Sequence, residues 1–280
     1  MGVRVATVAF GFGLLGDFAH PALALDLDAV LREVAARPDA PVAREGAAKA
    51  SRERETEEIA NERYGEAWRV YVEAYFAQML VRLHEERRTM LEHLVQGARS
   101  AYRAGRGAYV EVLAAEAAHS GALADLSAAV GESRVARAHL DMLLRRTPGG
   151  KDDVLLPPPI PDVPSDASVW TEAAMPEAEL RSHVLATHVT ARHAQRRARL
   201  IADTVVVFHE RAFDAAWNAY GAGELSLHVT LAAAEALFEQ KRSLLLARRD
   251  VALAQARFVA LTGRADVLGV TLLWAESATR

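Results

Sequence analysis

The chain has 280 residues, of which 51% are hydrophobic, 6% are aromatic and 25% are charged, and its formal net charge is −4. This composition is typical of a globular protein, its alanine content favours helices, and the charge is too close to neutral to favour nucleic acid as a partner. The chain has no cysteine, which excludes disulfides, thiolate metal sites and a cysteine nucleophile.

The first 24 residues have the pattern of a secretory signal peptide. Arg4 precedes an apolar run at 5–15, and residues 22–24 (Ala-Leu-Ala) form a signal-peptidase site. Residues 11–16 also match G-x-G-x-x-G, but a dinucleotide-binding fold would continue with further strand–helix units, which the sequence does not contain. We predict a signal peptide at 1–24. We predict no transmembrane helix, because no uncharged apolar run reaches the roughly 20 residues that span a bilayer.

Residues 25–146 are predicted to form the first of two helical repeats. The sequence predicts a short helix at 25–37 and a separate, highly charged helix at 42–63, most of whose surface is exposed. Prolines lie between these two helices. The repeat therefore begins with two elements that precede its long hairpin.

The first long helix of this repeat is predicted from apolar residues at alternating spacings of three and four. The pattern runs from Trp68 to Leu83, breaks at Arg87 and resumes at Met90. The second long helix of this repeat carries a stripe of residues, spaced by seven, that is mostly polar. Its members are Leu113, Ser120, Ser127, Arg134 and Asp141. We expect that side of the helix to be more exposed than its counterpart in the second repeat.

Residues 147–169 contain six of the ten prolines. Three of them are consecutive, at 157–159, and such a run adopts an extended polyproline conformation. We predict a semi-rigid linker between the two repeats.

Residues 170–266 are predicted to form the second repeat, and residues 267–280 a C-terminal tail in which 267–274 could form a strand. The first long helix of the repeat is predicted to begin at Pro176. It should bury one apolar series: Leu180, Val184, Thr187, Ala191, Ala194, Ala198, Ile201, Val205, Phe208 and Ala212. The second carries two stripes side by side: Leu237, Leu244, Val251 and Phe258, and Leu231, Phe238, Leu245, Ala252 and Val259. So wide an apolar face indicates neighbours on both sides.

The two repeats are related in sequence. Residues 101–146 align without gaps on residues 219–264, with 14 of 46 positions identical. The matched positions include Tyr-x-Ala-Gly, whose last residue, Gly105 or Gly223, is suited to the left-handed conformation that ends a helix. One structural unit is thus used twice. We predict an all-α fold: an elongated bundle of long antiparallel helices, built from two repeated helical hairpins.

Several features in this order are shared with one known family. They are Leu27-Asp28-Ala29-Val30 with Pro38, Tyr102-Arg103-Ala104-Gly105 followed by Val110-Glu111-Val112-Leu113, Tyr220-Gly221-Ala222-Gly223 with Leu231, and Thr262-Gly263 at the end of the last helix. With the Pro-rich linker between the repeats, the chain resembles the outer-membrane efflux protein family, the TolC-like exit ducts of tripartite pumps. The similarity extends over nearly the whole chain after the signal peptide.

The resemblance implies a non-catalytic transport role in the periplasm, with an association with the outer membrane. In the family three chains assemble, and the turns between the paired helices meet an adaptor protein of the pump. The matching residues here, which we take as candidate partner contacts, are Tyr102, Gly105, Arg106, Tyr220, Gly223 and Glu224. The two tyrosines could equally be core aromatics that pack under the turns. A homotrimer and an adaptor are therefore the expected partners.

The chain departs from the family pattern in two respects. In the family each repeat also carries a β-hairpin. Here only residues 61–67 are available for the first, and the second repeat has no room for one, so we expect both hairpins to be missing. The family often places an acidic residue after each turn; Glu111 fits this pattern, but the second repeat has Val229.

Other chemistry finds little support in the sequence. His183, His188 and His193 are spaced by five, which spreads them around a helix, so we interpret them as exposed or edge histidines and predict no metal site. The basic run at 192–199 is interpreted as a solvated helix face, with an acidic partner as the alternative. No catalytic triad order or phosphate loop is present, so we predict no enzyme activity and no cofactor. The leading hypothesis is a component or accessory of an export system. The alternatives are a periplasmic helical scaffold without a transport role, and a vestigial product without a function.

Overall fold

The computed structural model describes residues 24–36, 49–147, 154–172 and 178–268. Its elements are β1 (Ala24–Leu25), α1 (Leu27–Ala35), α2 (Lys49–Arg103), α3 (Tyr109–Leu143), β2 (Val154–Leu155), α4 (Ser168–Thr171), α5 (Ala178–Leu200), the π-helical turn η2 (Ile201–Val206), α6 (Val207–Ala222), α7 (Leu227–Thr262) and the 3₁₀ turn η3 (Ala265–Leu268). None of the described helices contains an apolar stretch that is long enough to cross a membrane.

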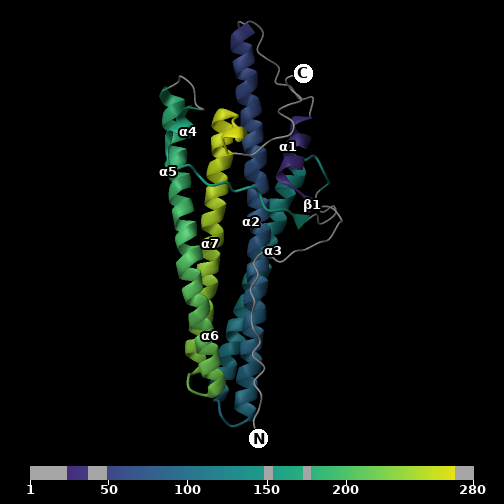
Figure 1. Ribbon diagram of the computed structural model, residues 1–280. Helices are drawn as coiled ribbons and strands as arrows, with labels where there is room; N and C mark the ends of the chain where they lie inside the picture. The colour runs from purple at the N-terminus through teal and green to yellow at the C-terminus, as the bar shows by residue number, and fades with distance from the viewer. Residues whose placement is uncertain (1–23, 37–48, 148–153, 173–177, 269–280) are drawn as a thin grey trace.

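Two long hairpins lie side by side and form an elongated bundle (Figure 1). The first consists of α2 and α3, and the second consists of α5, η2 and α6 followed by α7. The central helices α2 and α7 pack against each other, α3 packs along α2, and α5 and α6 pack along α7. The predicted all-α bundle of repeated hairpins is therefore confirmed. Residues 1–23 of the predicted signal peptide, and Pro176, lie outside the described residues.

Both hairpin turns have the same backbone geometry. Gly105 and Gly223 have φ angles of 68° and 81°. After each helix, the residue that follows the glycine donates a backbone hydrogen bond five residues back, from Arg106 to Ala101 and from Glu224 to Ala219, both at 2.9 Å. These are the bonds of a Schellman motif, which requires a left-handed residue at the glycine position. The repeated turn predicted from the sequence is confirmed.

The first hairpin differs from the prediction because α2 is one continuous helix of 55 residues. The prediction of a separate charged helix at 42–63 is wrong for the residues that the structure describes, because residues 49–63 are part of α2. Residues 61–67, the segment available for a hairpin, also belong to α2. Gly65 does not interrupt the helix, because it packs against α7; a Cβ there would lie 2.7 Å from Ala260 Cα. The apolar pattern is interrupted at Arg87, and α2 continues through this residue, whose charge is satisfied by ion pairs to other helices.

The second hairpin contains a π-helical turn that the sequence does not reveal. Val184, Ala191 and Ala198, spaced by seven, are buried in α5, and a regular helix would next bury Val205 and Ala212. Instead Val206 and Phe213 are buried. A π turn holds one residue more than an α turn, so the buried face moves on by one position. Phe208, predicted to be buried, is therefore 68% exposed.

The stripes of α7 agree with the sequence. Leu237, Leu244, Val251 and Phe258 are all buried. The second stripe is buried except for Leu245, which is half-buried. In α3 the corresponding stripe is exposed as predicted, apart from Asp141, which is buried and paired with Arg137 at 3.1 Å.

The Pro-rich segment is bound to the bundle in two places. Its first part forms β2, which pairs in parallel with β1 beside the Tyr71 hydroxyl. Its second part, Pro161 to Pro164, is bound by polar side chains of α5 and α7. The contacts are His188 Nε2 to Pro164 O at 2.9 Å, Arg192 to Val163 O at 3.0 Å, Gln195 to Asp162 at 2.8 Å, Arg199 to Asp162, and Gln255 to Pro161 O at 2.8 Å.

These contacts correct two interpretations of the α5 sequence. His188 is buried, and its ring packs edge-on against Trp170 at 5.3 Å, so it is not an exposed histidine. His183 and His193 are exposed as predicted. The basic run is only partly a solvated face, because Arg192 and Arg199 bind the linker. The prediction failed because the linker is distant in sequence.

The end of the described chain is also not a strand. Residues 267–268, at the start of the predicted strand 267–274, belong to η3. The remaining residues of that prediction lie outside the described part.

Candidate interaction site at the hairpin tips

The two hairpin turns lie at one end of the bundle, where the sequence placed its six candidate residues (Figure 1). Gly97, near the end of α2, faces the second hairpin; a Cβ there would lie 3.6 Å from the Tyr220 ring and 3.7 Å from Trp217. A hydrophobic cluster beneath the turns contains residues of both hairpins, among them Leu94, Ala98, Phe213 and Leu227. The fold therefore brings the two tips together into one surface.

Glu111 joins the two tips. Its Oε2 accepts a hydrogen bond from Ala108 N at 3.2 Å, at the start of its own helix. Its Oε1 accepts from Leu227 N at 3.4 Å, at the start of α7. The first N–H groups of a helix have no partner within that helix, and a carboxylate there is favourable. Glu111 thus caps both helices. An acidic residue is therefore not required at Val229, the corresponding position of the second repeat, to cap α7.

The two candidate tyrosines occupy different environments. Tyr102 is 48% exposed, and its ring lies 5.5 Å from that of Tyr109. Tyr220 is half-buried beside Trp217, and its hydroxyl oxygen is buried without a hydrogen-bond partner among the described residues. Burial raises the pKa of Tyr220, and the Glu111 carboxylate raises it further. Tyr220 thus packs as a core aromatic, whereas Tyr102 is accessible.

The other four candidates are exposed. Gly105, Arg106, Gly223 and Glu224 lie on the surface of the turns, and a Cβ at either glycine would meet no atom within 4 Å. The tip surface therefore carries one cation and one carboxylate from equivalent positions of the two repeats.

Exposed apolar residues surround this surface, and the candidates from the sequence did not include them. They are Tyr109, Val110, Leu113 and Val229. They follow the turns at the start of α3 and α7. A signal was available, because the apolar residues at 109, 110, 112 and 113 spread over more of the helix surface than a face that packs against one neighbouring helix.

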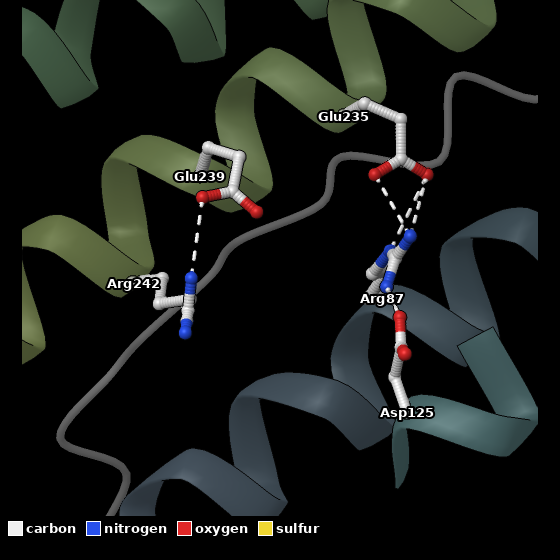
Figure 2. A network of polar contacts seen from close by, with 5 residues as sticks. All are labelled: Arg87, Asp125, Glu235, Glu239 and Arg242. Carbon is white, nitrogen blue, oxygen red and sulfur yellow. Dashed lines mark hydrogen bonds and ion pairs between the residues drawn. The ribbon is translucent and has the colours of Figure 1, made fainter. Parts of the chain in front are cut away.

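A second polar group lies around Arg87 of α2, further from the turns (Figure 2). Its guanidinium pairs with Asp125 of α3 at 2.6 Å and with Glu235 of α7 at 2.9 Å. It also lies over the Phe238 ring, 4.6 Å from the centroid. The Arg87 side chain is 13% exposed, so this residue links three helices through partly desolvated contacts. Glu239 and Arg242 form a separate pair on α7 at 3.6 Å.

A buried lysine lies close to this group. Lys241 of α7 is 5% exposed and pairs with Glu210 of α6 at 3.4 Å. Burial raises the pKa of Glu86 on α2, and Lys241 partly opposes this effect. Burial lowers the pKa of His84, whose ring lies 5.1 Å from that of Phe238. A cavity of about 20 Å³ lies between Glu86, Arg87 and Lys241 and their apolar neighbours, which is enough for roughly one water.

The described residues contain no group of three or more His, Asp or Glu side chains placed to hold a metal ion. The exposed histidines of α5 do not converge on a common point.

No protein-family model matches the chain, and no curated protein sequence matches it. Among solved structures, the outer-membrane channel OprN has a similar fold, with a TM-score of 0.58. The two chains are 14% identical, and the match covers 85% of this chain and 70% of that one. At this identity the likeness shows the fold alone. It agrees with the resemblance stated from the sequence at the level of the helical fold, and the similar protein is a channel rather than an enzyme.

Proposed function

We propose that this chain is a non-catalytic, periplasmic component or accessory of an export assembly, located at the outer membrane, and that its hairpin tips bind a periplasmic adaptor protein. The observation that carries the proposal is the single surface formed by the two tips, which Glu111 joins at the starts of α3 and α7. The likeness to the outer-membrane channel OprN supports the same class of function.

The chemistry of the tips suits a helical partner. Tyr102 and Tyr109 form an exposed aromatic pair, and such residues are enriched among interface anchors. Arg106 and Glu224 provide opposite charges beside the two turns, which would orient a partner that carries both signs. An amphipathic helical hairpin offers apolar residues at i, i+3 and i+4 with charged flanks, and so fits this surface.

Photo-crosslinking tests the tip contact. An unnatural photoreactive residue is placed at Arg106 or Glu224 and irradiated in periplasm, and crosslinked proteins are identified by mass spectrometry. We expect an adaptor or another pump component at both positions. Glu132, which is exposed far along α3, is the control position. If neither tip position captures a pump component above this control, the proposal is wrong.

The resemblance to the efflux family also leads us to propose that the chain forms a homotrimer. The mass in solution, measured by light scattering over a range of concentrations, tests this part. A trimer would support a duct-like assembly. A compact monomer at every concentration would contradict it.

The alternative is a periplasmic scaffold that binds copies of itself and transports nothing. The exposed apolar residues on the outer helices α3, α5 and α6 favour this reading, since they suit self-association without any role for the tips. Self-association in light scattering, together with no adaptor crosslink at the tips, would support the scaffold hypothesis.

A further inference from the structure

Residues 156–161 of the Pro-rich linker, which we call the strap, cross the bundle from α2 to α7 (Figure 1). At one end the Tyr71 hydroxyl of α2 lies 2.7 Å from the Leu156 carbonyl oxygen. At the other end the Gln255 side chain of α7 donates to Pro161 O at 2.8 Å. Both of these side chains are fully buried. The strap is therefore fixed at its two ends by residues of the core.

The backbone conformation of the strap follows from its prolines. Four of its six residues are proline, which fixes φ at about −65° and restricts the preceding residue to extended conformations. Burial repeats every third residue: Leu155 and Pro158 are buried and Pro161 is half-buried, whereas the residues between them are exposed. Three residues per turn is the period of the polyproline II helix. The strap is thus a preformed polyproline II helix with one of its three rows against the bundle.

The two outward rows of this helix are apolar. Leu156 and Pro159 form one row, and Pro157 and Ile160 form the other, with about 9 Å between the members of a row. Leu156 is 38% exposed and Ile160 is 37% exposed. The carbonyl groups of residues 157–160 accept no hydrogen bond from the described part of the chain. A segment that only connected the two hairpins would need neither large apolar side chains nor free carbonyls on its outer side.

These features are the ones by which polyproline II segments are recognised. Domains that bind such segments do so in grooves lined with aromatic side chains, which contact the apolar rows. Tyrosine and tryptophan also carry O–H and N–H donors that can bind free carbonyls. Because the strap is already held rigid, little conformational entropy would be lost on binding. The strap is a ridge, so its partner has to provide the groove.

We infer that the strap is a docking site for a protein with an aromatic-lined groove that takes a polyproline II segment, and that its two outward rows face this groove. Gln255, which holds the strap, lies about 40 Å along α7 from Leu227 at the tip end, at 1.5 Å per residue. The docking site is therefore distinct from the proposed adaptor contact at the tips. It goes beyond the proposed function and does not depend on it.

Photo-crosslinking with peptide mapping tests the inference. A photoreactive residue is placed at Leu156 or Ile160 of the full chain in intact cells that produce it, and the crosslinked peptides are identified by mass spectrometry. We expect both positions to capture the same protein, with the crosslinks in an aromatic-lined groove of that protein. Val169, which is 42% exposed and lies outside the strap, is the control position and should capture this protein several-fold less.

A double variant tests whether the polyproline II conformation is needed. Pro157→Ala combined with Pro159→Ala keeps both large apolar side chains but removes two restraints on the backbone. Capture at Ile160 should fall several-fold, while the helical circular dichroism stays unchanged, since both prolines are exposed. Pro164→Ala, in the linker but outside the strap, is the matched control and should leave capture unchanged.

Three results would overturn the inference. The first is that neither strap position captures a protein above the level at Val169. The second is that the crosslinks lie outside an aromatic-lined groove, or only on a second copy of this chain. The third is that the double proline variant captures its partner as well as the wild type does. None of these readouts involves the hairpin tips, so failure here and failure of the tip crosslinks are distinguishable.

Discussion

The Glu111 carboxylate of the first repeat and the Leu227 backbone N–H of the second repeat form a hydrogen bond, with 3.4 Å between Oε1 and N. The other carboxylate oxygen accepts from Ala108 N at 3.2 Å. One side chain therefore caps the second helix of both hairpins, although the two helix starts are more than a hundred residues apart in sequence. The repeats are similar in sequence but share a single acidic cap.

Replacing Glu111 by alanine should destabilise the tips. We expect a loss of about 1–2 kcal/mol in the free energy of unfolding, as for a lost N-cap, measured by urea denaturation. Hydrogen exchange should become faster at the starts of both α3 and α7. Glu132→Ala, an exposed site on the same helix, should change the stability by less than about 0.5 kcal/mol. Faster exchange confined to α3 would show that Glu111 does not bridge the tips.

Gly65 and Gly131 should respond in opposite ways to substitution by alanine. A Cβ at Gly65 would lie 2.7 Å from Ala260 Cα and 3.0 Å from its backbone nitrogen, so α2 and α7 would have to move apart at a cost of about 1–3 kcal/mol. At Gly131 a Cβ would meet nothing within 4 Å. Gly131→Ala should therefore stabilise α3 by about 1 kcal/mol through helix propensity. Thermal unfolding of both variants checks this, and a neutral Gly65→Ala would contradict the close approach of α2 and α7.

Arg87 should contribute more to stability than an exposed arginine. Arg87→Met removes charged hydrogen bonds to Asp125 and Glu235, which should cost about 1–3 kcal/mol because the guanidinium is largely desolvated. Arg99 pairs with Glu116 at 2.7 Å, but its side chain is 53% exposed. Arg99→Met should therefore cost less than about 1 kcal/mol. Urea denaturation compares the two variants, and equal losses would show that the link between three helices adds nothing.

The stability of the bundle should depend on pH through His84. Burial lowers the pKa of His84 below its ordinary value of 6.5, so the unfolded chain binds this proton more readily than the folded chain. The contribution of neutral His84 is therefore present above about pH 6.5 and is lost as the pH falls through the folded-state pKa. The wild-type chain should lose more unfolding free energy between pH 7.5 and 5 than His84→Phe does. His228→Asn, at an exposed site, should follow the wild type. Parallel curves for the wild type and His84→Phe would refute this assignment.

Local sequence patterns predicted much of the fold. The all-α class, the two hairpins and both left-handed glycines follow from the spacing of apolar residues and from one repeated turn motif. The stripes of α7 also follow, because this helix has neighbours on both sides and its wide apolar face leaves no ambiguity. These features depend on residues within a few turns of one another.

The candidate site was only partly predictable. Its location at the turns and the exposure of Arg106 and Glu224 agree with the sequence. The difference between Tyr102 and Tyr220 could not be predicted, because only Tyr220 lies beneath the second tip beside Trp217. The role of Glu111 at α7 likewise depends on how the two hairpins are placed.

By itself, the sequence determined the repeated hairpins and their turns, since backbone conformation and helical periodicity are local properties. Only the tertiary structure decided that Arg87 pairs with α3 and α7, that a π turn moves Phe208 outward and that His188 binds the linker. In each case a contact with a distant segment outweighs the local preference. Carboxylates of α3 and α7 satisfy Arg87, packing of Phe213 sets the face of α6, and a carbonyl of the linker gives buried His188 its partner. Periodicity along one helix contains no information about such partners.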